Sequence, residues 1–99
     1  MSYRYIYDPV ALNEYKDAIS WYLERSELAA EGFVKEVNEQ LAIICKDPFR
    51  FRNTYKSYRE ISLKKYPYYV VYLVDEVQKV IIVSSVYHHK RNPQKKYRK

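Results

Sequence analysis

The 99-residue sequence is poor in the residues on which several common kinds of site depend. It contains one glycine, Gly32, so it has no glycine-rich loop of the kind that cradles nucleotide phosphates. It contains one cysteine, Cys45, which excludes an internal disulfide. The apolar neighbours Leu41, Ile43 and Ile44 favour a small buried side chain at that position. Because the sequence has no glycine-rich loop, nucleotide sites of the P-loop and Rossmann kinds are excluded.

Long apolar runs are also missing. No stretch reaches about eighteen apolar residues, the length that a membrane-spanning helix needs. The N-terminal sequence, Met-Ser-Tyr-Arg-Tyr, lacks the charged and then apolar pattern of a signal peptide. These absences predict a cytoplasmic protein without a membrane partner. The length predicts one domain over residues 1–99, which buries its apolar residues in a single core.

Acidic residues are scarce in the second half of the chain. Residues 50–99 carry thirteen Lys and Arg against three Asp and Glu, a net charge of +10. Residues 1–49 carry five against nine, a net charge of −4. The three acids of the basic half offer no pair of carboxylates for hydrolysis. The asymmetry favours a partner with a phosphate backbone or an acidic protein surface.

The first half predicts a strand followed by a helix. Tyr3 to Tyr7 is rich in β-formers, and Asp8 with Pro9 marks a helix start. An amphipathic helix of about sixteen residues follows. Its apolar stripe is Ala11, Tyr15, Ala18, Ile19 and Tyr22, and its polar side is Glu14, Lys16, Asp17 and Glu24. Trp21 lies off the stripe, where it either covers a helix edge or contacts a partner.

A second helix follows almost at once, with Ser26 as its N-cap. Its apolar positions are Ala30, Phe33, Val34, Val37, Leu41 and Ile44, and Lys46-Asp47-Pro48 ends it. So short a connection predicts an antiparallel hairpin of helices. Gly32 lies inside this helix at a cost of about 1 kcal/mol against Ala. Close packing to the first helix is the explanation that we expect.

The second half predicts a sheet. Strands are expected over residues 58–66, 68–74 and 79–87, after a segment, Phe49 to Ser57, that contains a short strand or an extended loop. The strand over 68–74 is apolar on both faces, which indicates a central position and places Tyr68, Tyr69 and Tyr72 on the sheet faces. Residues 94–99 form a basic tail. The predicted fold is α+β, in the order β-α-α-β-β-β, with the helix hairpin on one face of a largely antiparallel sheet.

The polar residues of the last strand do not form a metal or nucleophile site. His88 and His89 are adjacent, and neighbouring strand residues point to opposite faces. No Cys or third His accompanies them, so we expect no metal and no other cofactor. Ser84 and Ser85 lie inside a strand instead of a tight turn flanked by glycine, which argues against a nucleophilic serine.

The remaining chemistry belongs to His, Arg, Lys and Tyr, a set that can cleave RNA without metal. A base deprotonates the 2′-hydroxyl, cations stabilise the phosphorane, and an acid protonates the leaving oxygen. His88 is the candidate acid or base, and Arg59 and Arg91 are the candidate phosphate clamps. The same residues can equally bind phosphate or protein without catalysis. Arg59 can also pair with Glu60 or with a helix acid.

These residues occur in an order that resembles a known family. The order is Tyr58-Arg59-Glu-Ile-Ser-Leu-Lys-Lys-Tyr-Pro67-Tyr68-Tyr-Val-Val-Tyr72, a turn, and Val80-x-Ile82-x-x-x-Val86-Tyr-His88-x-x-Arg91-x-Pro93. It follows a helix with the pattern Ala11-x-x-x-Tyr15-x-x-Ala18-Ile19-x-Trp21-Tyr22, and Pro48 after the second helix. Over nearly the whole chain, the sequence resembles the RelE/ParE-type toxins of type II toxin–antitoxin systems.

The resemblance implies a toxin that a small antitoxin neutralises by wrapping it with an acidic or amphipathic segment. RelE-like members are ribosome-dependent mRNA endoribonucleases, and ParE-like members poison DNA gyrase. Arg59 matches the arginine that enters the middle strand, and His88 matches the histidine that closes the last strand in both branches. The RelE-like branch implies a basic cluster and a C-terminal aromatic residue, for which the candidates are Lys56, Lys64, Lys65, Lys90, Arg91 and Tyr97.

Three hypotheses about function follow. In the first, the protein cleaves mRNA in the ribosomal A site, with Arg59, Lys64 and Arg91 on phosphate and His88 in proton transfer. In the second, it binds DNA gyrase and catalyses nothing itself, which the first-helix pattern and His88-x-x-Arg91 favour. The third is a basic RNA-binding module unrelated to toxins.

Overall fold

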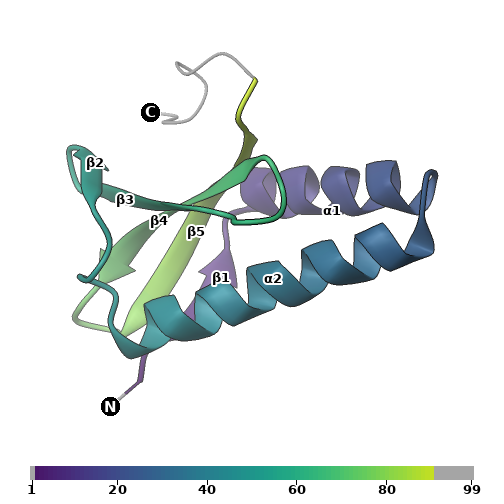
Figure 1. Cartoon of the computed structure of the whole chain (residues 1–99). Helices are drawn as coiled ribbons and strands as arrows, with labels where there is room; N and C mark the ends of the chain where they lie inside the picture. The colour runs from purple at the N-terminus through teal and green to yellow at the C-terminus, as the bar shows by residue number, and fades with distance from the viewer. Residues whose placement is uncertain (1, 91–99) are drawn as a thin grey trace.

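The structure of the protein is a computed structural model that describes residues 2–90 (Figure 1). Two helices cover one face of a five-stranded sheet. The elements are β1 (Arg4–Tyr7), α1 (Pro9–Leu23), α2 (Glu27–Lys46), β2 (Asn53–Tyr55), β3 (Tyr58–Ser62), β4 (Tyr68–Asp75) and β5 (Val80–His88). The strand order is β1-β5-β4-β3-β2, and β1 alone runs parallel to its neighbour, β5. This architecture confirms the predicted fold class.

The two helices begin where the sequence predicts. The Asp8 carboxylate accepts a hydrogen bond from the Val10 backbone N–H at 2.9 Å, and the Ser26 hydroxyl accepts one from the Ala29 N–H at 3.1 Å. Each bond satisfies a donor that the first helical turn leaves unpaired. The helices form the expected antiparallel hairpin (Figure 1). Within the described residues, neither helix is long and apolar enough to cross a membrane.

The core lies between the helix hairpin and β4 and β5. Tyr68, Val70 and Tyr72 project from β4 toward the helices, as alternation along a strand requires. They meet buried residues of the predicted helix stripes and of β5, namely Ala11, Ala18, Phe33, Val37, Leu41, Ile44, Ile81 and Val83. Full burial of each large apolar side chain contributes about 1.5 to 3 kcal/mol, so these positions dominate the stability.

Of the two alternatives predicted for residues 49–57, the structure has the short strand, β2, which adds a fifth strand at the sheet edge. The second half differs from the prediction where β3 ends. The strand predicted over residues 58–66 ends at Ser62. The chain reverses there because the Leu63 N–H donates to the Tyr68 carbonyl, and because Glu36 of α2 binds the next two backbone N–H groups. Alternation alone could not reveal a carboxylate supplied by another element.

The reason for the single glycine also differs from the expectation. Gly32 admits Tyr66 of the β3–β4 loop onto α2, instead of bringing α1 closer. A Cβ atom at residue 32 would lie 2.3 Å from the Tyr66 hydroxyl oxygen, which is far inside van der Waals contact. The same hydroxyl donates to the Ala29 carbonyl at 2.8 Å. Gly32 therefore fixes the β3–β4 loop against the helix.

Cys45 occupies the position that its apolar neighbours predict. It is a free cysteine near the end of α2, buried within the core. Burial raises the pKa of its thiol, because desolvation disfavours the thiolate. A raised pKa makes the side chain a weak nucleophile, so Cys45 acts as a small apolar residue.

Candidate functional site

Arg59, the second residue of β3, is held by backbone carbonyls. Its guanidinium donates to the Phe51 carbonyl at 2.7 Å and lies 3.5 Å from the Phe49 carbonyl. The guanidinium carbon also lies 5.0 Å from the centre of the Phe49 ring. Glu60, the acid that the sequence offers as a partner, pairs instead with Arg52 at 3.7 Å. The cation of Arg59 thus stabilises the connection that follows α2.

Tyr72 fixes the same connection from the neighbouring strand. It pairs with Arg59 across β3 and β4, and its buried hydroxyl donates to the Pro48 carbonyl at 2.8 Å. Burial raises the pKa of Tyr72 to about 12, although the nearby Arg59 cation opposes the shift. We call Arg59, Tyr72 and residues 48–51 the Arg59 cluster. The side chains of Arg59 and Tyr72 both bind carbonyls of residues 48–51.

Basic and aromatic side chains alternate on the exposed surface beside this cluster. The Lys56 ammonium lies 5.3 Å from the Tyr55 ring centre, and the Arg50 guanidinium lies 5.4 Å from that of Phe51. Lys56 occupies the β2–β3 turn with a φ of 50°, and its carbonyl accepts a bond from the Asn53 amide. On this surface, basic side chains lie beside aromatic rings, which is the combination that we expect to bind an anionic partner.

His88 is the last residue of β5, which lies on the opposite side of β4 from β3 and Arg59. It pairs with Tyr68 of β4, and the two rings meet edge to face with centres 5.0 Å apart. Its Nδ1 accepts a hydrogen bond from the Lys90 backbone N–H at 3.0 Å. The neutral ring therefore carries its proton on Nε2.

A pocket of about 380 Å³ opens beside His88, between α1 and the ends of β4 and β5. We call it the aromatic pocket. It is lined by four side chains with aromatic rings, Trp21, Tyr22, Tyr68 and His88, and by two acids, Glu14 and Asp17. No Lys or Arg of the described chain lines it, although the second half of the sequence is strongly basic.

His89 points to the other face of the sheet, as the sequence predicts. Its ring lies over Tyr69, with centres 4.3 Å apart, whereas His88 contacts Tyr68 on the helix face. Its Nε2 lies 3.2 Å from the Ser62 hydroxyl. Over residues 2–90, no three His, Cys, Asp or Glu side chains gather closely enough to hold a metal ion.

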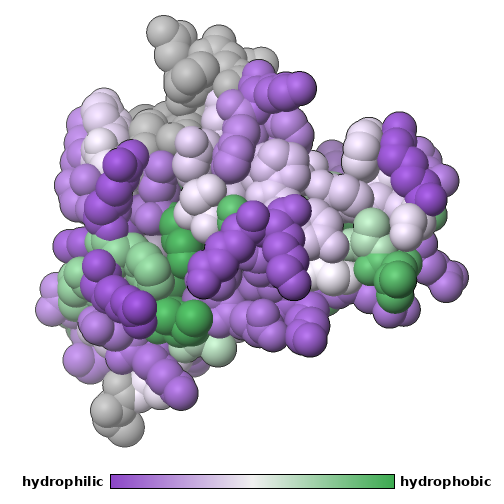
Figure 2. Space-filling model, viewed as in Figure 1, coloured by the Kyte–Doolittle hydropathy of each residue, from purple (hydrophilic) through white to green (hydrophobic). Residues whose placement is uncertain are grey.

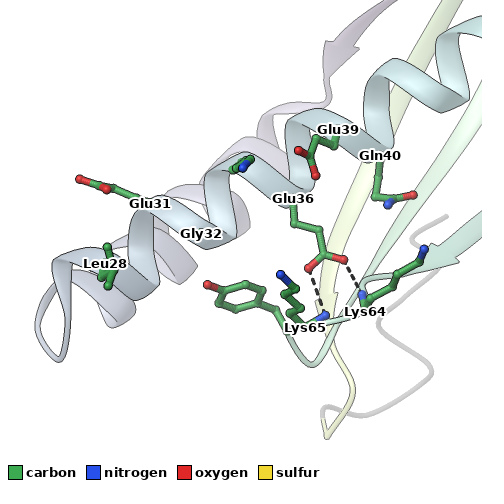
Figure 3. Close-up of a pocket in the computed structure, with 10 residues that line it drawn as sticks. Leu28, Glu31, Gly32, Glu36, Glu39, Gln40, Lys64 and Lys65 are labelled. Carbon is green, nitrogen blue, oxygen red and sulfur yellow. Dashed lines mark hydrogen bonds between the residues drawn. The ribbon is translucent and has the colours of Figure 1, made fainter.

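Lys64 and Lys65 lie on the β3–β4 loop, facing an acidic stretch of α2. Figure 3 shows the carboxylate of Glu36 reaching this loop, where it accepts hydrogen bonds from both lysine backbone N–H groups. The pocket between loop and helix is also lined by Glu31 and Glu39. Both lysine side chains are exposed, but their surroundings are as acidic as they are basic.

The structure does not bring the candidate residues to one point. Arg59 pairs with Tyr72 and His88 pairs with Tyr68, which is four residues away along β4. That separation amounts to roughly 13 Å along the strand, and β4 itself lies between them. Lys90 lies two residues beyond His88, whereas Lys64 and Lys65 lie on the β3–β4 loop. Arg91, Tyr97 and the basic tail over 94–99 fall outside the described residues.

Glu14 has a role that sequence patterning missed. We expected it on the polar side of α1, but its carboxylate accepts hydrogen bonds from the Ser85 hydroxyl and the Val86 N–H, both at 2.9 Å. The pairing of β1 with β5 ends at Val83, so Glu14 accepts a hydrogen bond from a backbone N–H of β5 that lies beyond the end of β1. The only sign of this role in the sequence is that Glu14 lies one turn before the apolar Ala18. Helical periodicity places an acid at that position on the solvent side of the helix.

Apolar residues also reach the surface near the turn between the helices. Leu23 is 52% exposed and Leu28 is 78% exposed. Figure 2 shows a largely hydrophilic face on which apolar residues gather at that turn and again near the opposite end of α2. Leu23 also lines an open groove of about 570 Å³ between α1 and α2, where Ile19, Ala30 and Val34 form an apolar floor.

The sequence matches a family model described as "ParE toxin of type II toxin-antitoxin system, parDE" over residues 5–93. A comparison with curated proteins gives no match. The family match favours the two toxin hypotheses over an unrelated RNA-binding module.

Solved toxins share the fold. A chain of the chromosomal ParDE system from P. aeruginosa superimposes with a TM-score of 0.73 at 14% identity, covering 89% of this chain and 96% of that one. A chain of the intact E. coli RelBE complex gives 0.65 at 20% identity, covering 91% and 100%. A chain of the RelBE2 complex from Mycobacterium tuberculosis gives 0.58 at 12%, covering 89% and 99%. With its fold shared and nearly its whole length matched, the chain belongs to the ParE toxin family of type II toxin–antitoxin systems.

Proposed function

We propose that this toxin stops bacterial growth by binding DNA gyrase in the cytoplasm, and that it does not cut mRNA. One observation carries the choice between the two mechanisms. Arg59 and His88, the residues on which an RNA-cleaving site would depend, lie apart and are engaged differently. The match to the ParE toxin model agrees with this choice.

Metal-independent RNA cleavage needs an acid, a base and a cation around one phosphate. Arg59 directs its guanidinium at two backbone carbonyls, and turning it toward a phosphate would leave the Phe51 carbonyl without its donor. His88 has its Nδ1 occupied by the Lys90 N–H, so in neutral form it offers a donor and no base. This arrangement supports binding over catalysis.

Cleavage of mRNA in the ribosomal A site is the alternative. It requires Arg59, Lys64, Lys65 and Arg91 to contact phosphate in the bound state, with His88 transferring a proton. The exposed basic and aromatic surface around Lys56 favours this alternative, because such surfaces bind nucleic acid. The two mechanisms differ in a product that can be measured directly.

A small antitoxin is the partner that we propose for the helix hairpin. Related toxins have been solved in complexes described as RelBE, and the family name pairs a toxin with an antitoxin. The groove between α1 and α2 has an apolar floor, rimmed by Glu31, Lys35 and Glu39, and suits the apolar side of an amphipathic segment. Leu23→Asp should weaken neutralisation by the protein encoded beside this gene, whereas Leu28→Asp, outside the groove, should not.

The test in cells is induction of the toxin followed by two readings from one culture. Gyrase binding predicts DNA breaks that depend on gyrase, with the 5′ ends of transcripts unchanged. New transcript ends in phase with codons, lost in His88→Ala and Arg59→Lys, would overturn the proposal. Measuring both variants for folding by circular dichroism separates loss of a site from loss of structure.

A further inference from the structure

The aromatic pocket has the composition of a site for a cation. Rings carry negative charge on their faces and attract ammonium or guanidinium groups within about 6 Å. Here the rings of Trp21, Tyr22 and Tyr68 line one cavity together with the carboxylates of Glu14 and Asp17. The combination of several rings with two acids is what distinguishes it from the apolar groove between the helices.

The walls of the pocket are held in place before any ligand binds. The Tyr22 ring contacts both Trp21 and Tyr66 edge to face, with centres 5.0 and 5.2 Å apart. Glu14 is fixed by its two hydrogen bonds to β5. Preorganised walls reduce the entropy that binding must overcome.

Trp21 already carries one guanidinium. The Arg25 guanidinium carbon lies 3.7 Å from the centre of the Trp21 ring, and its NH1 donates to the Trp21 carbonyl at 2.8 Å. Trp21 is nevertheless 49% exposed, and it also lines the pocket. Arg25 therefore fixes the indole as a wall, and the contact shows that a flat guanidinium stacks well on this ring.

Asp17 supplies the charge that a ligand can use. It is exposed at the pocket, and its carboxylate makes no hydrogen bond or ion pair with another side chain or backbone group of residues 2–90. Glu14 adds negative charge from the wall but is committed to β5. A cation entering the pocket would thus meet aromatic side chains together with a carboxylate, to which a guanidinium can donate two hydrogen bonds.

We propose that the aromatic pocket receives an arginine side chain of a partner protein. The volume of about 380 Å³ accommodates one long side chain, and the acids of the first half, Glu14 and Asp17, give the pocket a charge opposite to that of an arginine. Arginine fits better than lysine because its planar, weakly hydrated group stacks on rings and binds a carboxylate with two donors. The proposal holds whether the toxin acts on gyrase or on the ribosome.

The test uses the purified full-length toxin and a capped tripeptide, acetyl-Ala-Arg-Ala-amide. Trp21 is the only tryptophan of the chain, so the tryptophan fluorescence and the indole N–H signal both come from a residue that lines this pocket. The peptide should cause a saturable change, and the matched peptide with neutral citrulline should bind about fivefold more weakly or worse. Equal binding of both peptides would overturn the proposal, and so would the absence of a saturable change.

Variants locate the site. Asp17→Asn should weaken the arginine peptide about threefold to tenfold, because it removes the free carboxylate and little else. Glu76→Gln removes an equal charge from the exposed β4–β5 turn and should leave binding unchanged. An equal loss of peptide affinity in both variants would show that only net charge matters, and it would overturn the proposal that the peptide binds in the aromatic pocket. Neither side chain belongs to the core, so folding is preserved in both.

Discussion

The Arg59 cluster and the aromatic pocket lie at different points along β4, and they differ in what their polar groups do. In the Arg59 cluster, the guanidinium and the Tyr72 hydroxyl bind carbonyls of residues 48–51. In the aromatic pocket, Asp17 has no such partner within residues 2–90, and rings surround an open cavity. A charged residue that matches the family pattern, Arg59, thus serves the fold, whereas Asp17, which lies outside that pattern, is left exposed at a pocket.

Arg59→Ala should have the largest effect of the changes that test this contrast. It removes a charged donor from the Phe51 carbonyl, and hydrogen bonds from charged groups contribute about 1.5 to 3 kcal/mol. We expect the free energy of unfolding in urea to fall by about 2 to 3 kcal/mol. Arg59→Lys should recover part of the loss. Stability equal to that of the wild type would contradict a structural role and return Arg59 to the candidate clamps.

The pH dependence of stability tests the second member of the same cluster. The pKa of Tyr72 is about 12 in the folded protein and near its ordinary value of 10 in the unfolded chain. The unfolded state therefore loses its proton first, so Tyr72 stabilises the fold fully below pH 10 and loses this contribution as the pH rises toward 12. The loss should reach about 2 kcal/mol.

Tyr72→Phe is the control for that measurement. Burial also raises the pKa of Tyr7, Tyr15 and Tyr22, so the wild-type protein will weaken in alkali for several reasons. The variant lacks one of these groups, and its stability should fall less steeply between pH 10 and 12. Parallel curves for the two proteins would show that Tyr72 ionises as readily in the folded state as in the unfolded one.

Gly32→Ala probes the loop that follows β3. Alanine should gain about 1 kcal/mol in helix propensity, but its Cβ would collide with the Tyr66 hydroxyl. We expect a net destabilisation of about 1 kcal/mol in thermal unfolding. In a Tyr66→Phe background the collision is relieved, and the same substitution should become neutral or stabilising. Additive effects of the two changes would contradict the contact.

His88→Ala should have the smallest effect on the fold. The ring is half-buried beside Tyr68, and its hydrogen bond is to the backbone two residues away. We expect the free energy of unfolding to change by less than about 1 kcal/mol. A fall in the free energy of unfolding as large as that expected for Arg59→Ala would show that His88 also stabilises the fold, and it would contradict the difference between the Arg59 cluster and the aromatic pocket.

The fold could be predicted from the sequence because its signals are local. The caps at Asp8 and Ser26, the helix stripes and the apolar run that became β4 each depend on near neighbours in the chain. The end of β3 could not be predicted, since it depends on Glu36, which lies 28 residues before Lys64. Gly32 carried a clear signal of close packing, but the sequence could not name Tyr66 as the group that approaches.

The spatial arrangement of the candidate site residues could not be predicted from the sequence. His88 and Arg59 were identified by type and order, and neither property says whether two strands bring them together. Glu14 was assigned to solvent because helical periodicity does not show where a neighbouring strand leaves a donor unpaired. The sequence leaves Trp21 open between covering a helix edge and contacting a partner, and in the structure this residue is 49% exposed and lines the aromatic pocket.

The most direct test of the account is the supercoiling of relaxed plasmid by purified gyrase in the presence of increasing amounts of the toxin. Binding without RNA chemistry predicts that supercoiling falls and that broken DNA accumulates, while mRNA on translating ribosomes stays intact at the same concentrations. Unchanged gyrase activity at concentrations where ribosome-bound mRNA is cut would contradict the central claim.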